Sequence, residues 1–126
     1  MTVKKVMIVD DDRDLIEELQ EALSLRGYEV VAISESTSAL DTVFSLKPDV
    51  ILLDLKMDGM SGFQIAQSLR RVPSTAPIPI IAMTGVLNKE NHRALMEAYG
   101  ITVCLEKPFN PYMVIDTIEA VLRKGA

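Results

Sequence analysis

The chain has 126 residues, of which 48% are hydrophobic and 25% charged, a balance that fits one soluble globular domain spanning residues 1–126. Its net charge is −5, and Lys and Arg form no run longer than a pair, which argues against direct binding to nucleic acid. The single cysteine, Cys104, excludes an intrachain disulfide and a cysteine-based zinc site. The first apolar run, Val6–Val9, is too short for a signal peptide or a membrane span, so we expect a cytoplasmic protein without a membrane partner.

Short apolar runs alternate with longer amphipathic segments along the whole chain. Each short run is predicted to be a strand, and several are continuously apolar, which is typical of parallel strands covered on both faces. In chain order the predicted strands are Val6–Val9, Val30–Ile33, Val50–Leu53, Ile78–Met83 and Ile101–Leu105.

The segments that follow these runs carry apolar residues at helical spacing. The apolar stripes lie within Leu15–Leu23, Ala39–Phe44, Phe63–Leu69, Ala94–Ala98 and Val114–Leu122. Gly27 is a suitable residue for the end of the first helix, and Asn110 followed by Pro111 is a strong start signal for the last. The alternation predicts an α/β fold, a doubly wound parallel (βα)₅ sheet with the flavodoxin-like strand order 2-1-3-4-5.

In an open parallel sheet, ligands bind beyond the carboxyl ends of the strands, where the strand order reverses. Asp10–Asp12 follow the first predicted strand, Asp54 follows the third, Thr84 the fourth, and Glu106–Pro108 the fifth. The predicted topology therefore gathers at least three carboxylates, a hydroxyl and the amine of Lys107 at one edge of the sheet.

This set of side chains is suited to phosphoryl chemistry. Adjacent carboxylates repel one another unless a cation joins them, and carboxylate oxygens suit Mg²⁺, which keeps several coordinated waters. Lys107 can pair with phosphate, and Thr84 can donate a hydrogen bond to a phosphoryl oxygen. Because a carboxylate can accept a phosphoryl group covalently, Asp54, central in the set, is the expected nucleophile.

Each of these residues also has a structural interpretation when it is taken alone. Asp10–Asp12 could be the N-cap and first-turn acids of the following helix, and Asp54 could begin a turn near Asp58. Lys107 before a proline could be a solvated loop residue. The functional interpretation depends on their joint placement, each at its own strand end on one edge of the sheet.

The chain resembles the response-regulator receiver family from Val6 to Leu122. The motifs that carry the resemblance are Val6–Asp11, Val50–Gly62, Ile80–Gly85 and Glu106–Phe109. The resemblance implies that Asp10 and Asp11 bind Mg²⁺, with Asp11 favoured over Asp10 as a direct ligand. The resemblance further implies that Asp54 accepts the phosphoryl group and contacts the Mg²⁺ ion. The backbone carbonyl of Lys56 would be a further metal ligand. Thr84 would be the hydroxyl that moves toward the phosphate, and Lys107 the ion-pair partner of the phosphate.

The resemblance also implies the partners of the domain. The phosphoryl donor would be a phosphohistidine on a sensor histidine kinase or on a histidine phosphotransfer protein. The output surface would lie at about 88–123 and would act on a separate output protein or on a fused effector domain. The domain would not be an enzyme, apart from assisting its own phosphorylation and dephosphorylation.

Two positions depart from the family pattern. Cys104 stands where the family usually has an aromatic residue whose rotation reports phosphorylation, and Tyr99 is a candidate to replace it. Asp58 stands where proline is frequent. The departure at Cys104 leaves an alternative function, a pseudo-receiver that binds proteins without control by phosphorylation. A phosphoester hydrolase is disfavoured, because such enzymes generally need an acid-base group where Lys56 stands.

Overall fold

The computed structural model describes residues 3–57, 61–85, 89–101 and 103–124 and forms one five-stranded sheet with helices on both faces. The strands are β1 (Lys5–Val9), β2 (Glu29–Ile33), β3 (Val50–Asp54), β4 (Ile80–Thr84) and β5 (Val103–Glu106). The helices are α1 (Arg13–Leu25), α2 (Ala39–Leu46), α3 (Gly62–Arg70), α4 (Lys89–Ala98) and α5 (Pro111–Lys124), with a short 3₁₀ turn, η1 (Ser36–Ser38), before α2. None of the described helices is long and apolar enough to cross a lipid bilayer.

All pairs of neighbouring strands are parallel, in the order β2-β1-β3-β4-β5. The predicted fold class and strand order are therefore confirmed. The register pairs Asp54 with Met83 and Thr84 with Glu106. The ends of β3, β4 and β5 consequently meet at the same edge of the sheet, next to the residue that follows β1.

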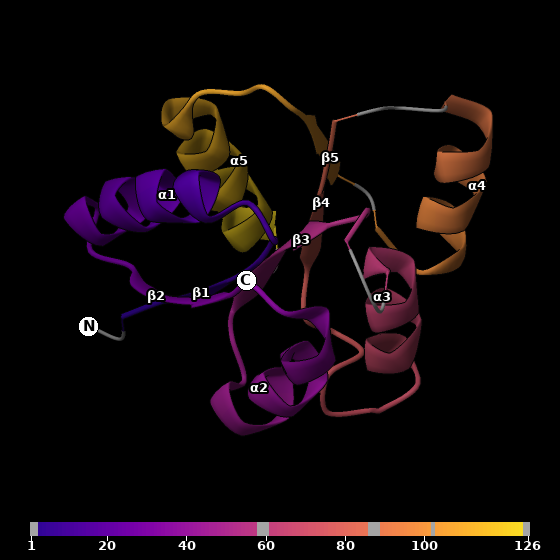
Figure 1. The fold of residues 1–126 in the computed structure, drawn as a ribbon. Helices are drawn as coiled ribbons and strands as arrows, with labels where there is room; N and C mark the ends of the chain where they lie inside the picture. Colours follow the sequence, from indigo (N-terminus) through magenta and orange to yellow (C-terminus); the bar gives the residue numbers. More distant parts are fainter. Residues whose placement is uncertain (1–2, 58–60, 86–88, 102, 125–126) are drawn as a thin grey trace.

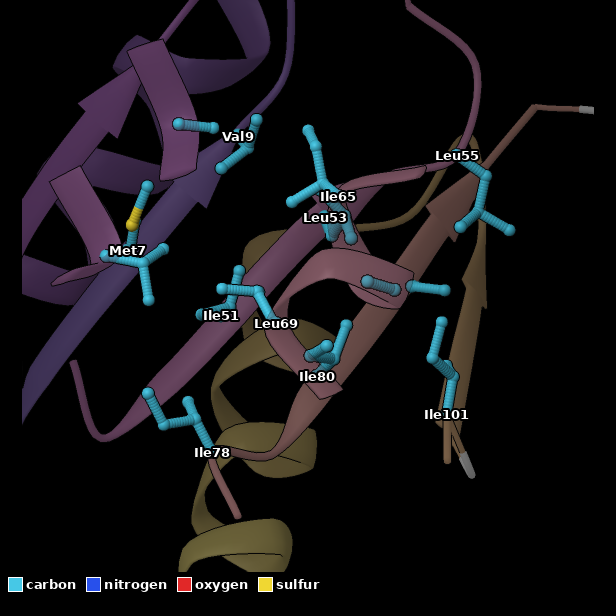
Figure 2. Close-up of a cluster of buried hydrophobic side chains, with 14 residues drawn as sticks. Met7, Val9, Ile51, Leu53, Leu55, Ile65, Leu69, Ile78, Ile80 and Ile101 are labelled. Carbon is cyan, nitrogen blue, oxygen red and sulfur yellow. The ribbon is translucent and has the colours of Figure 1, made fainter. Parts of the chain in front are cut away.

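The core has two halves, one on each face of the sheet. Figure 1 shows α1 and α5 together on one side and α2 and α3 on the other. On the α2 and α3 side, buried residues from the strands pack against Val43, Ile65 and Leu69. Figure 2 shows this half, in which Met7, Ile51 and Ile80 come from three adjacent strands. Because both faces are covered, β3 and β4 are buried along their entire length, as their unbroken apolar runs predicted.

The helix signals that were read from the sequence correspond to observed helix ends. Gly27 follows the C-cap of α1 with φ of 89°, the left-handed conformation that glycine adopts without strain. The side chain of Asn110 accepts a hydrogen bond of 2.9 Å from the N–H of Met113 at the start of α5. Lys47, at the end of α2, has φ of 51°, a conformation that the sequence did not indicate.

The strand boundaries differ slightly from the prediction. The fourth strand was predicted from Ile78, but β4 begins at Ile80, because Pro79 precedes it and lacks a backbone donor. Asp54 and Thr84 were predicted to follow their strands and are instead the last residues of β3 and β4. The ladder reaches beyond them, since the N–H of Leu55 donates to Met83 and that of Lys107 donates to Thr84.

Candidate functional site

Asp54 lies at the end of the central strand β3 and is only 4% exposed. Its Oδ1 accepts a hydrogen bond of 3.0 Å from the N–H of Lys56. Its Oδ2 lies 3.5 Å from Nζ of Lys107. One carboxylate oxygen is thus held by the backbone of the β3–α3 turn, and the other faces the ammonium group from the end of β5.

The three consecutive aspartates after β1 have three different environments. Asp10 is fully buried, and its Oδ1 accepts a hydrogen bond of 2.9 Å from the N–H of Asp12. Asp11 is exposed to solvent. Asp12 is the N-cap of α1, where its side chain accepts a hydrogen bond of 3.2 Å from the N–H of Leu15. The capping interpretation therefore holds for Asp12, whereas Asp10 points into the site.

Lys107 joins the ends of β1, β3 and β5. Its Nζ lies 2.7 Å from Oδ2 of Asp10, a short charge-assisted hydrogen bond, and farther from Asp54. Burial lowers the pKa of the Lys107 amine, but the hydrogen bonds and charges of Asp10 and Asp54 together raise it more, so the pKa lies above its ordinary value. Lys107 is therefore a permanent cation at neutral pH.

The pKa of the Asp54 carboxyl is raised from its ordinary value of 3.8 to about 6. Burial is the main cause, and the N–H of Lys56 opposes it by stabilising the carboxylate. The charge of Asp10 raises the pKa further, while that of Lys107 lowers it. The negative charge of the Asp54 carboxylate is only partly balanced, because Lys107 lies closer to Asp10 than to Asp54.

Carboxylate oxygens of Asp10, Asp11 and Asp54 all lie within 4.8 Å of one another. Their donor chemistry fits Mg²⁺, which prefers hard oxygen ligands and keeps several waters. Asp11 is exposed, so the cluster is open to water on one side. The residues present therefore fit the metal that the sequence predicts. The side chain of Lys56, whose carbonyl is the fourth predicted ligand, is also exposed.

Thr84 ends β4 and is 2% exposed. Its carbonyl accepts a hydrogen bond of 2.7 Å from the N–H of Lys107. The fold therefore brings Thr84 to the same edge of the sheet as Asp54, on the adjacent strand, and ties it through the backbone to Lys107. This is where a hydroxyl that contacts a phosphoryl group on Asp54 is expected.

Cys104 lies in the middle of β5 and is partly buried against the half of the core that contains α3. Burial is the main cause that raises the pKa of its thiol, and the nearby Glu106 raises it further, which disfavours a reactive thiolate. The aromatic rings in this region belong to Phe63 and Tyr99, whose centroids are 6.4 Å apart and whose planes are tilted by 46°. Tyr99, the suggested substitute, thus packs against α3.

Two residues with a role in positioning α3 were not identified from the sequence, one beside the site and one at the far end of the helix. Gly62, the first residue of α3, lies directly against the backbone of Asp54. Arg70, in the last turn of α3, donates hydrogen bonds to the carbonyls of Tyr99, Ala76, Ile78 and Gly100, and so joins α3 to the loops on either side of β4 and α4. Neither role has a local signal in the sequence, since each depends on segments that meet only in the folded chain.

Comparison with known proteins places this chain in a family. Residues 6–119 match the family described as the response regulator receiver domain. The phosphate regulon transcriptional regulatory protein PhoB of Pseudomonas aeruginosa is 35% identical over 124 residues, which cover 98% of this chain and 54% of that protein. The DNA-binding response regulator MtrA of Mycobacterium tuberculosis is 31% identical over 122 residues, which cover 97% of this chain and 52% of that protein.

Solved structures agree with this assignment. The chemotaxis protein CheY4 of Vibrio cholerae superposes with a TM-score of 0.89 at 30% identity, covering 95% of this chain and 99% of that one. The chain spans about half the length of the curated relatives named above. It belongs to the family of response regulator receiver domains, two-component signalling modules whose general function is phosphorylation-dependent switching.

Proposed function

We propose that this domain accepts a phosphoryl group on Asp54 from a phosphohistidine, with Mg²⁺ bound by Asp10, Asp11, Asp54 and the backbone carbonyl of Lys56. The observation that carries the proposal is the placement of the Asp54 carboxylate. It lies in a cluster of three carboxylates and within 3.5 Å of the Lys107 ammonium. An acceptor carboxylate, a cation site and a positive charge thus meet at one point.

Each side chain of the site has a separate role in phosphoryl transfer. An oxygen of Asp54 forms a bond to phosphorus as the bond from phosphorus to the donor imidazole nitrogen breaks. Lys107 compensates negative charge that develops on the phosphoryl oxygens, and Thr84 donates a hydrogen bond to one of them. Bound Mg²⁺ supplies further compensation of phosphoryl charge and lowers the repulsion among the carboxylates. The carboxylate of Asp54 is the nucleophile, so its pKa of about 6 allows transfer at neutral pH.

The consequence of transfer is a change at the output surface, about 88–123, which includes α4, β5 and α5. Residues 88 and 102 of this surface lie outside the described residues. The carbonyl of Thr84 accepts a hydrogen bond from Lys107, and β4 pairs directly with β5. Movement of the Thr84 hydroxyl toward a phosphoryl group therefore acts at the border of this surface.

The partners belong to the proposal as well. The donor is a sensor histidine kinase or a histidine phosphotransfer protein, and the output acts through a separate protein or a fused effector domain. The net charge of −5 does not favour contact of this domain itself with nucleic acid. These partners would interact with the domain in the cytoplasm.

Intact-mass measurement tests the acceptor. The protein is incubated with acetyl phosphate and Mg²⁺, beside Asp54→Asn and the control Asp41→Asn, which removes an exposed carboxylate in the first turn of α2. The wild type and the control are expected to gain one phosphoryl mass that alkali removes, and Asp54→Asn is expected to gain none. A wild type that gains no phosphoryl group would identify the chain as a pseudo-receiver, the alternative that Cys104 raises.

A further inference from the structure

The start of α3 is fixed next to the end of β3. Ser61 is the N-cap of α3, and its side chain accepts a hydrogen bond of 3.3 Å from the N–H of Gln64. The Gln64 side chain in turn accepts one of 2.8 Å from the N–H of Ser61. The first residue of the helix, Gly62, donates its N–H to the carbonyl of Leu55 at 3.4 Å. The helix therefore begins at a defined point on the turn that carries Asp54.

Gly62 has no space for a side chain. A Cβ at this residue would lie 2.2 Å from the carbonyl oxygen of Asp54, 2.8 Å from Cα of Leu55 and 3.0 Å from the carbonyl carbon of Asp54. All three atoms belong to the backbone, so none can rotate away as a side chain could. Gly62 does not have a positive φ, unlike Gly27 and Gly100. The reason for glycine here is close approach rather than an unusual backbone conformation.

The peptide that Gly62 touches also orients the acceptor carboxylate. The peptide between Asp54 and Leu55 is fixed on its other side by β4, because the N–H of Leu55 donates to the carbonyl of Met83 at 3.0 Å. The next N–H, that of Lys56, holds Oδ1 of Asp54. The peptide between Asp54 and Leu55 is thus confined between a strand and a helix start, and the N–H of the peptide that follows it holds the Asp54 carboxylate.

We propose that Gly62 is a positioning residue for phosphoryl transfer, a role that rests on the proposed function of Asp54. Its missing Cβ lets the start of α3 lie on the Asp54 carbonyl and so sets the direction of the acceptor carboxylate. A methyl group would have to move by about 1 Å to reach an ordinary contact. A displacement of that size at a reacting group can slow a reaction by about 100-fold.

Helix propensity alone gives the opposite expectation for substitution by alanine. Alanine stabilises a helix relative to glycine, so a position that served only the helix would tolerate or favour Gly62→Ala. Gly85, one residue after Thr84, provides a matched control, because a Cβ there would have no heavy atom within 4 Å. Gly85→Ala makes the same chemical change at the same edge of the sheet without the backbone contact.

The experiment compares wild type, Gly62→Ala, Gly85→Ala and Asp54→Asn with acetyl phosphate at saturating Mg²⁺. The rate of phosphoryl gain is followed by intact mass as a function of acetyl phosphate and expressed per folded molecule, with the folded fraction taken from circular dichroism. Sucrose is added where that fraction falls, because it favours the compact state. The backbone amide resonance of Lys56, which reports its hydrogen bond to Asp54, is recorded by NMR without any phosphoryl donor.

For Gly62→Ala we expect the maximal rate per folded molecule to fall by about 10- to 100-fold. We also expect its Lys56 amide resonance to shift, while Gly85→Ala stays within about twofold of the wild type and keeps the resonance in place. A Gly62→Ala variant that retains the wild-type rate per folded molecule, or an unmoved Lys56 resonance, overturns the proposal. A wild type that takes up no phosphoryl group overturns the function of Asp54 instead, and the Lys56 resonance still decides whether Gly62 sets the geometry.

Discussion

Replacement of Asp54 by asparagine is expected to stabilise the fold in the absence of metal. The carboxyl is 4% exposed, and its pKa in the folded protein, about 6, lies above its ordinary value of 3.8. The folded state therefore binds this proton more tightly than the unfolded chain does. Stability associated with the protonated carboxyl is complete below pH 3.8 and is lost as the pH rises through about 6.

The size of this loss of stability follows from the two pKa values of Asp54. A rise of the pKa from 3.8 to about 6 corresponds to about 3 kcal/mol of unfolding free energy lost between strongly acidic and alkaline pH. About 1.4 kcal/mol of this loss is expected between pH 5 and pH 8. Asn at position 54 is neutral throughout and can still accept the hydrogen bond from Lys56. The substitution removes only the 3.5 Å ion pair with Lys107 and leaves the 2.7 Å ion pair between Lys107 and Asp10 in place.

Urea unfolding in EDTA at pH 5 and pH 8 measures this effect. At pH 8 the free energy of unfolding of Asp54→Asn is expected to exceed that of the wild type by about 1–3 kcal/mol. The excess should shrink by about 1.4 kcal/mol at pH 5. Taking the difference between the two proteins removes the titration of all other carboxyl groups. Asp41→Asn, which removes an exposed carboxylate, is measured beside it as the matched control.

The expected stabilisation is refuted if Asp54→Asn is less stable than the wild type at pH 8, or if its advantage is the same at both pH values. Either result would mean that the acceptor carboxylate is well compensated in the metal-free fold.

Four further outcomes are expected. Mg²⁺ should raise the free energy of unfolding by about 1.4 kcal/mol for each tenfold increase above its dissociation constant, as followed by urea unfolding. Asp11→Asn should require higher Mg²⁺ for the same effect. Lys107→Met leaves the fully buried Asp10 without its cation, so unfolding at pH 7 should become easier by about 3 kcal/mol, and an NMR titration should place the pKa of Asp54 above its wild-type value. Arg70→Met removes hydrogen bonds to four backbone carbonyls and should cost about 2–4 kcal/mol in urea unfolding, with Arg70→Lys recovering only part of it.

The fold was predictable because its determinants are local in the sequence. Strands that are buried on both faces appear as unbroken apolar runs, and the helices between them have apolar stripes and clear end signals such as Gly27 and Asn110. The parallel topology then places the residues at the strand ends together. This is why Asp54, Thr84 and Lys107 could be assigned to one edge of the sheet from their positions in the chain.

The contacts within the site were not predictable in the same way. The sequence does not show that Lys107 lies closer to Asp10 than to Asp54, since the choice depends on burial and on the path of β5. It does not show the contact of Gly62 with the Asp54 carbonyl either. The roles of the three aspartates after β1 also differ, although their side chains are identical, because only Asp12 is at the position of a helix cap.

The placement of Lys107 bears on how phosphorylation would change the domain. In the structure its ammonium is bound to Asp10 at 2.7 Å, while its backbone N–H is bound to the carbonyl of Thr84 at 2.7 Å. A phosphoryl group brings a charge of about −1.5 to −2 to Asp54, more than the carboxylate it replaces. We therefore expect the ammonium to move from Asp10 toward the phosphoryl oxygens while its backbone stays fixed to β4. An NMR structure with beryllofluoride on Asp54 in which Nζ remained on Asp10 would contradict this expectation.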